Sequence, residues 1–208
     1  MGPDFWQRVM WSDECSFDTS RGTTKWVIRT KGKRYHPACC ESVFKSNSTS
    51  IPILGAIDYN WKSPLVFLEG HGKKGGVTME DYKKQVIEAV VGPAFEHGWG
   101  RKDGLFQEDN ASIHDTKGGL RDLKQELGIH LFDWPPSSPD LSPIETLWRL
   151  LKQRIYRRKK PPRTRTDLIQ AIKEEWDRLE PKDWRKYVDS VPTRLQQVQK
   201  RRGLATDF

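Results

Sequence analysis

The chain has 208 residues, of which 31% are charged and 35% hydrophobic, and its formal net charge is +8. A single domain of this length can bury a substantial core. The sequence excludes a membrane-spanning helix, because no apolar run approaches the necessary ~18 residues. Its three cysteines lack the number and the Cys-x-x-Cys spacing of a disulfide framework or a zinc site.

The first half of the chain is predicted to be mainly strands. Runs of β-branched and aromatic residues predict strands over 8–17, 25–30, 51–57 and 65–68. A helix is predicted after Thr78, because Thr78 and Asp81 have nearly the spacing and chemistry of a capping box and an apolar stripe of period 3.6 follows. Gly92-Pro93 is expected to end that helix.

The second half alternates strand and helix patterns and then becomes helical. Two short strands are predicted, over 105–106 and 129–132. Helices are predicted over 120–127, 142–158, 167–179 and 184–202, the last of them perturbed by Pro192. This order of elements is typical of a three-layer α/β fold with a mixed central sheet.

Positive charge is concentrated near the C-terminus. Residues 152–208 carry 17 Lys or Arg against 8 Asp or Glu, a net charge of +9, whereas residues 1–151 have a net charge of −1. Such a basic region attracts nucleic acid through phosphate contacts and counterion release. For any single lysine, a solvated surface position is the simpler interpretation.

Three acids occur where regular elements would hold them in place. Asp13 lies within the first predicted strand, Asp109 closes a later one, and Glu145 begins a helix beside its apolar stripe. Carboxylates held close together repel each other, and a cation between them relieves the repulsion. Mg²⁺ prefers oxygen ligands and retains water, which leaves room for a phosphate. Two such ions, roughly 3.5–4 Å apart, activate a hydroxyl nucleophile and stabilise a leaving oxygen.

Each acid also has a simpler interpretation when it is taken alone. Asp13 fits a polar residue on the solvent face of a strand, Asp109 fits an Asx-turn, and residues 142–145 match a capping box. The ordered trio with its flanking sequence favours the metal site instead. Glu14 and Glu108 are expected to point away from it, since side chains alternate along a strand.

At these acids the chain resembles the catalytic domain of a mariner-superfamily DDE transposase, in the branch whose final acid is Glu. The similarity is carried by WSDE at 11–14, by QEDNA at 107–111 with His114, and by WPPSSPDLSPIE at 134–145. Weaker similarity extends over nearly the whole chain. The resemblance implies an RNase H-like fold, with a mixed central β-sheet flanked by α-helices and with further C-terminal helices.

The resemblance also predicts how the chain is organised. Residues 1–158 would form the catalytic core, and residues 159–208 a basic helical extension packed on it. Members of this family place helix-turn-helix DNA-binding domains before the catalytic domain. Nothing of that kind precedes Asp13 in this sequence, so we expect the chain to correspond to the catalytic part.

The activity implied is metal-dependent DNA transposition. Phosphodiester bonds would be hydrolysed at transposon ends, and the freed 3′-OH joined to target DNA at a TA dinucleotide. Asp13, Asp109 and Glu145 carry over as catalytic acids and as ligands for two Mg²⁺ ions per site, for which Mn²⁺ would substitute. Asn110 and His114 are auxiliary candidates; for His114 a local hydrogen-bonding role is equally consistent.

The expected partners are DNA and, in the DNA complex, a second copy of the chain, in the nucleus and without a membrane or a nucleotide cofactor. A P-loop ATPase is rejected, since the glycine-rich segment 70–78 lacks the Gly-Lys-Ser/Thr ending. Candidate DNA contacts are Lys25, Arg29, Lys31, Lys33, Arg34, Arg149, Lys152, Arg157, Arg158, Lys159 and Lys160. Two alternatives stay open: a catalytically inactive DNA-binding or assembly protein derived from a transposase, and another nuclease of the RNase H-like group.

Overall fold

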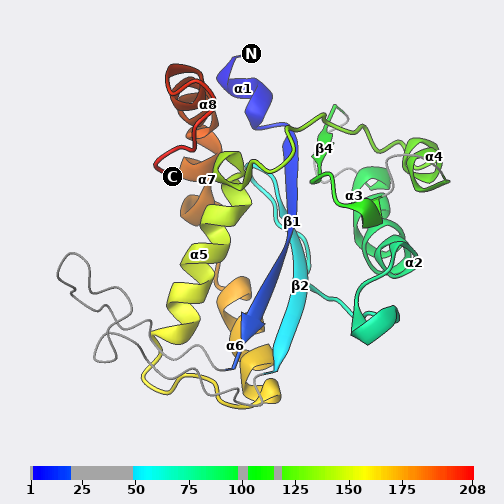
Figure 1. Cartoon of the computed structure of the whole chain (residues 1–208), viewed down its shortest axis with the longest axis vertical. Coiled ribbons are helices and arrows are strands. Elements are labelled where there is room, and N and C mark those ends of the chain that lie inside the picture. The colour runs from blue at the N-terminus through cyan, green and yellow to red at the C-terminus, as the bar shows by residue number, and fades with distance from the viewer. Residues whose placement is uncertain (1, 20–48, 98–102, 115–118) are drawn as a thin grey trace, which may run out of the picture.

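The computed structural model describes residues 2–19, 49–97, 103–114 and 119–208 (Figure 1). A mixed sheet with the strand order β3-β2-β1-β4 lies at its centre. The strands are β1 (Val9–Asp18), β2 (Ser50–Ile57), β3 (Val66–Phe67) and β4 (Leu105–Gln107). β2 is antiparallel to both β1 and β3, whereas β4 is parallel to β1. The predicted α/β class with a mixed sheet is confirmed.

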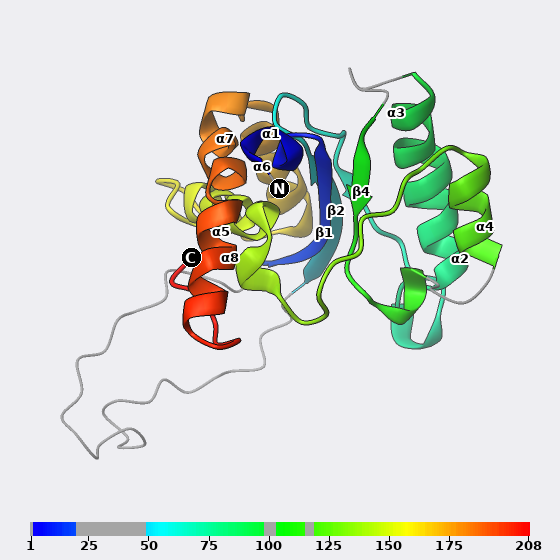
Figure 2. The same ribbon diagram turned by 90° about the horizontal axis from the view of Figure 1, so that it is seen from above.

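Helices cover both faces of the sheet, so the molecule has three layers (Figure 2). On one side lie α2 (Met79–Tyr82), the π-helical segment Lys83–Val91, α3 (Gly92–Glu96) and α4 (Gly119–Glu126). On the other lie α5 (Pro143–Tyr156), α6 (Arg165–Asp177), α7 (Pro181–Asp189) and α8 (Val191–Lys200). The short helix α1 (Pro3–Trp6) precedes β1.

Strand alternation in β1 divides the core into two clusters. Val9, Trp11 and Phe17 pack in a cluster that contains the apolar stripe of α5, while Met10 packs with the α2 side. Buried residues of α6 and α7 join the α5 cluster, so the helices after residue 159 pack on this face. The division of the chain at residue 158 stays a prediction.

The predicted helix after Thr78 begins as expected but continues further. Thr78 and Asp81 form the capping box. Gly92-Pro93 does not end the helix, which proceeds through a π-helical segment into α3. Pro93 lies at the junction where the π-helical segment, whose last N–H bond runs from Gly92 to the Ile87 carbonyl, gives way to α3.

Two other predicted elements differ from the structure, and a third lies outside the described residues. The strand over 129–132 is reduced to one parallel bridge between Phe106 and Leu131. The helix over 184–202 is divided at Ser190 into α7 and α8, and Pro192 occupies the first turn of the second. The strand over 25–30 lies outside the described residues.

Candidate active site

The three predicted acids line one cleft of about 240 Å³. Asp13 comes from β1, Asp109 follows β4, and Glu145 lies in the first turn of α5. β1 and β4 are parallel neighbours in which Trp11 pairs with Gln107, so the same register continued by two residues brings Asp109 beside Asp13. The structure thus unites three acids that are far apart in the sequence.

Asp13 is held by the helix layer. Its Oδ2 accepts a hydrogen bond of 3.1 Å from the indole Nε1 of Trp148 on α5. Gly55 is the residue opposite Asp13 on β2, and a Cβ at Gly55 would lie 2.7 Å from the Trp148 ring. The glycine therefore leaves the space in which Trp148 reaches Asp13.

None of the described residues that line the cleft is a lysine or arginine. Burial raises the pKa of Asp13 to about 8, and repulsion from Glu145, Glu14 and Asp109 adds to the rise. A divalent cation would supply the missing charge. The oxygen-rich donors of Asp13, Asp109 and Glu145 fit a hard ion such as Mg²⁺ or Mn²⁺.

Asp109 is held from the opposite side by His114. Its Oδ1 lies 2.8 Å from Nδ1 of His114 and also accepts a 2.9 Å hydrogen bond from the Ala111 N–H. The Asx-turn is therefore present, and it orients the carboxylate without removing it from the cleft. The hydrogen bond from His114 lowers the pKa of Asp109, although partial burial opposes this.

His114 connects Asp109 to a further acid. Its Nε2 lies 3.1 Å from Oε1 of Glu14. Burial would lower the pKa of His114, but the hydrogen bonds to Asp109 and Glu14 outweigh it and raise the pKa to about 10. One ligand atom each of Glu14, Asp109 and His114 lie within 4.8 Å of one another. The buried imidazolium thus bridges two carboxylates.

The two flanking acids differ. Glu14 does lie on the sheet face opposite Asp13, but the turn Ser112–His114 brings His114 to that face and so links Glu14 to the site. The expected orientation of Glu14 is therefore confirmed, and its connection to Asp109 runs through His114. Glu108 points away as predicted: it accepts hydrogen bonds from Lys124 at 2.5 Å and from the Tyr82 hydroxyl at 2.9 Å.

Glu145 does not take part in a capping box. Ser142 is the N-cap of α5, but its side chain makes no capping hydrogen bond. Its Oγ is buried without a partner, and its N–H donates to the Pro139 carbonyl at 3.1 Å. The cap interpretation is therefore wrong, and the Glu145 carboxylate lines the cleft instead.

Two further residues of the predicted motifs, Gln107 and Trp134, line the cleft. Gln107 lines the cleft, is 3% exposed, and carries an Oε1 without a hydrogen-bond partner. Trp134 forms another wall and packs edge-on against Trp11, with ring centroids 5.0 Å apart. Asn110 fixes this wall, since its Nδ2 donates to the Trp134 carbonyl at 3.1 Å. The spacing of Gln107 two residues before Asp109 was the available signal.

The candidate DNA contacts fall into three groups. Lys25, Arg29, Lys31, Lys33 and Arg34 lie outside the described residues. Arg149, Arg157, Lys159 and Lys160 are exposed, and Lys152 is partly buried with its Nζ over the Phe17 ring. Arg158 forms ion pairs with Glu174 and Glu175, which tie the end of α5 to α6. DNA contact by these residues stays a prediction.

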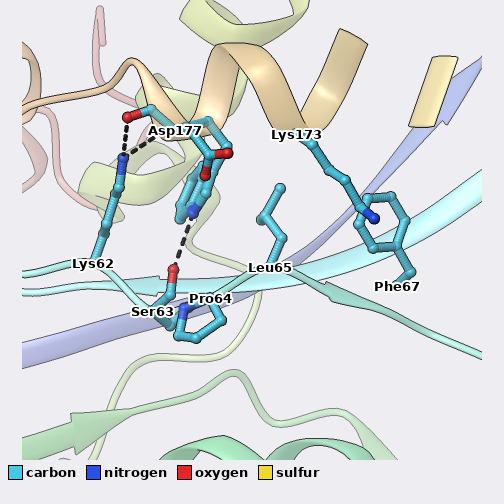
Figure 3. A pocket seen from close by; sticks show the side chains of 8 residues that line it. Lys62, Ser63, Pro64, Leu65, Phe67, Lys173 and Asp177 are labelled. Atoms are coloured by element: carbon cyan, nitrogen blue, oxygen red, sulfur yellow. Dashed lines mark hydrogen bonds between the residues drawn. The ribbon is translucent and has the colours of Figure 1, made fainter. Parts of the chain in front are cut away.

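A second pocket, of about 490 Å³, lies between the β3 edge and α6 (Figure 3). Lys62 donates to the carbonyls of Asp177 at 3.1 Å and Leu179 at 2.7 Å. The Trp176 indole donates to the Ser63 carbonyl at 2.9 Å. These hydrogen bonds satisfy carbonyls at the end of α6 and hold the helix on the sheet.

Comparisons with known proteins agree with this geometry. The family model described as DDE superfamily endonuclease matches residues 8–169. The Tc1 transposase of Caenorhabditis elegans is 29% identical over 211 residues, covering 100% of this chain and 72% of the relative. The Tc3 transposase of the same organism is 29% identical over 198 residues, covering 95% of this chain and 57% of the relative.

Solved structures show the same fold. A Mos1 transposase paired-end complex with left transposon end has a TM-score of 0.75 at 17% identity, covering 97% of this chain and 57% of that chain. The Mos1 catalytic domain with Raltegravir and Mg has a TM-score of 0.67 at 16% identity, covering 98% of this chain and 88% of that chain. The chain thus spans little more than half of the longer relatives.

Within the described ranges, no helix has the length and apolar character to cross a bilayer.

Proposed function

Because the chain belongs to the DDE superfamily endonucleases, as a catalytic domain of the Tc1/mariner transposase type, we propose that it cuts DNA at transposon ends and joins the freed 3′-OH to target DNA. The observation that carries this proposal is the convergence of Asp13, Asp109 and Glu145 on one cleft. Each acid comes from a different regular element or its end, which is how a fold holds ligands in fixed directions.

We propose that these three acids hold two Mg²⁺ ions, for which Mn²⁺ substitutes. When bound, such ions supply activation of the attacking oxygen and stabilise charge on the leaving oxygen. The protein's part is to fix the ligands: Trp148 orients Asp13 from one side of the sheet, and His114 orients Asp109 from the other. Trp134 and the proline-rich segment 135–139 narrow the cleft around the acids.

We further propose TA as the target dinucleotide, a second copy of the chain in the DNA complex, and the nucleus as the location. The basic C-terminal region supports DNA binding, as does the exposed Arg149 one helical turn after Glu145. Sequencing of joined products tests the target, light scattering of the DNA complex tests the dimer, and imaging of a tagged chain tests the location.

The decisive experiment compares Asp109→Asn with wild type and with Asp122→Asn, an exposed acid on α4 that serves as a matched control. A labelled duplex with a free 3′-OH is incubated with a plasmid target and Mg²⁺. We expect wild type and Asp122→Asn to join the strands and Asp109→Asn to fall to background. Equal joining by Asp109→Asn, or joining that continues in EDTA, would overturn the proposal. Cleavage of an RNA–DNA hybrid without joining would indicate a different nuclease.

A further inference from the structure

Arg194 on α8 is a fully buried arginine whose hydrogen bonds converge on the start of α5. Its Nη1 donates to the Asp140 carbonyl at 2.9 Å and to the Ser142 carbonyl at 3.3 Å. Its Nη2 donates to Oγ1 of Thr146 at 3.1 Å, and its Nε to Oγ of Ser190 at 2.9 Å. Arg194 therefore hydrogen-bonds to residues that precede Glu145 in the sequence and to one that follows it.

This is an unfavourable place for a cation. The N-terminus of a helix carries partial positive charge, which repels Arg194. Burial, followed by repulsion from Arg149, lowers the pKa of Arg194 to about 10. Within the described ranges no carboxylate forms an ion pair with it, and its hydrogen bonds go to neutral oxygens. Proteins break local rules of this kind mainly at functional sites.

The C-terminal tail keeps the guanidinium buried. The Phe208 ring lies over it, with Cζ 4.6 Å from the ring centroid. The Thr206 N–H donates to Oδ2 of Asp140 at 2.7 Å, which fastens the tail to the same turn. The tail residues that make both contacts, Thr206 and Phe208, lie beyond residue 169, where the match to the family model ends.

The local sequence favours a competing arrangement. Ser142 and Glu145 have the spacing of a capping box, in which the Glu carboxylate would bond to the Ser N–H and the Ser hydroxyl to the Glu N–H. Neither bond is made: the Ser142 N–H donates to Pro139, and the Ser142 hydroxyl has no partner. The Ser142 N–H is instead engaged by the turn Pro139–Leu141, and Arg194 donates to carbonyls of this turn and of Ser142 itself.

We propose that Arg194 is a positioning residue for Glu145, which prevents the capping box at the start of α5 and keeps the Glu145 carboxylate in the acid cleft. The inference rests on the proposed function, because it assigns Glu145 to a metal site. Arg194 is not one of the residues that line the cleft, and it acts through the turn Pro139–Leu141, Ser142 and the first turn of α5.

The test measures Mn²⁺ affinity of the full chain by electron paramagnetic resonance of the free ion. We expect Arg194→Met to weaken binding about 10- to 100-fold, the usual effect of losing a group that orients a metal ligand. Arg194→Lys, which keeps the charge but not the planar fork, should lie between Met and wild type. Arg154→Met is the matched control, since it removes an α5 arginine that pairs with Asp183 at 2.8 Å, and it should bind Mn²⁺ as wild type does.

A double-mutant cycle separates positioning from general destabilisation. In a Glu145→Gln background, Arg194→Met should cause no further loss of Mn²⁺ affinity. A loss of the same size as in wild type would overturn the proposal. Unchanged Mn²⁺ affinity in the single variant Arg194→Met would overturn it as well. If Arg194→Met does not fold, Arg194→Lys carries the same cycle.

A crystal structure of the variant gives a readout that needs no metal. We expect the Ser142 hydroxyl to accept from the Glu145 N–H once Arg194 is replaced; an unchanged first turn of α5 would refute the inference. If Glu145→Gln and Asp13→Asn both bind Mn²⁺ as tightly as wild type, the proposed function fails, and this crystallographic result still decides the role of Arg194.

Discussion

Gly55→Ala should destabilise the protein even though alanine is usually accepted in a strand. The added Cβ would lie 2.7 Å from Cη2 of Trp148 and 3.1 Å from Cη2 of Trp176. Carbon atoms in normal contact are about 3.5–4.0 Å apart. The Trp148 ring is buried and stacked on Trp176, with centroids 5.4 Å apart, so it cannot move away from the new Cβ without displacing its neighbour.

The expected change in the free energy of unfolding is the sum of two opposing effects. Overpacking of a filled core costs about 1–3 kcal/mol. Replacement of glycine reduces the entropy of the unfolded chain, which offsets at most about 1 kcal/mol of that cost. We therefore expect a lower free energy of unfolding, measured by urea denaturation. Because Trp148 donates to Asp13, the same displacement should also weaken Mn²⁺ binding.

Two comparisons test the reasoning. Gly119→Ala meets nothing within 4 Å and should be neutral or stabilising. In a Trp148→Phe background the atom that the Cβ meets most closely is gone, so Gly55→Ala should cost at least about 1 kcal/mol less than in wild type. An equal cost in both backgrounds would show that the close approach of Trp148 is not the cause.

The remaining predictions concern buried charges. Asp13 has a folded pKa raised from 3.8 to about 8, so in EDTA its contribution to stability is present below pH ~4 and is lost as the pH rises to 8. Asp13→Asn should therefore raise the melting temperature relative to wild type at pH 9 but not at pH 4; a difference independent of pH would contradict this. Lys124→Met should cost about 3–5 kcal/mol in urea denaturation, because it leaves Glu108 without the buried partner 2.5 Å away. Adding Glu108→Gln should recover part of that loss, and simple additivity of the two changes would argue against the pairing.

Local patterns explain which elements were predictable. β1, β2 and α5 follow from alternation or a period of 3.6 within a few residues, and the Thr78 capping box from a spacing of three. The continuation of the helix through Pro93 was not predictable, because it depends on a π-helical turn and not on composition. The prediction of a strand over 129–132 was wrong, because only one residue pair forms a β-bridge there.

The three acids of the site could be predicted from the sequence, but the residues that hydrogen-bond to them could not. Asp13, Asp109 and Glu145 occur in motifs that can be read along the chain, and the sheet order then brings them to one cleft. The hydrogen bond from Trp148 to Asp13 and that from His114 to Glu14 join residues at least 100 positions apart. No local pattern encodes such pairs, and the spacing at Ser142 even predicts the wrong partner for Glu145.

Each acid is thus fixed by a partner from a different part of the fold. Trp148 on α5 holds Asp13, the turn after Asp109 supplies His114, and Arg194 on α8 holds the helix start that carries Glu145. The last of these partners follows its acid in the chain by 49 residues and lies against the Phe208 ring of the C-terminal tail. With Arg194 in the role proposed for it, the geometry of the acid cleft depends on the packing of α8 as well as on the sheet and α5.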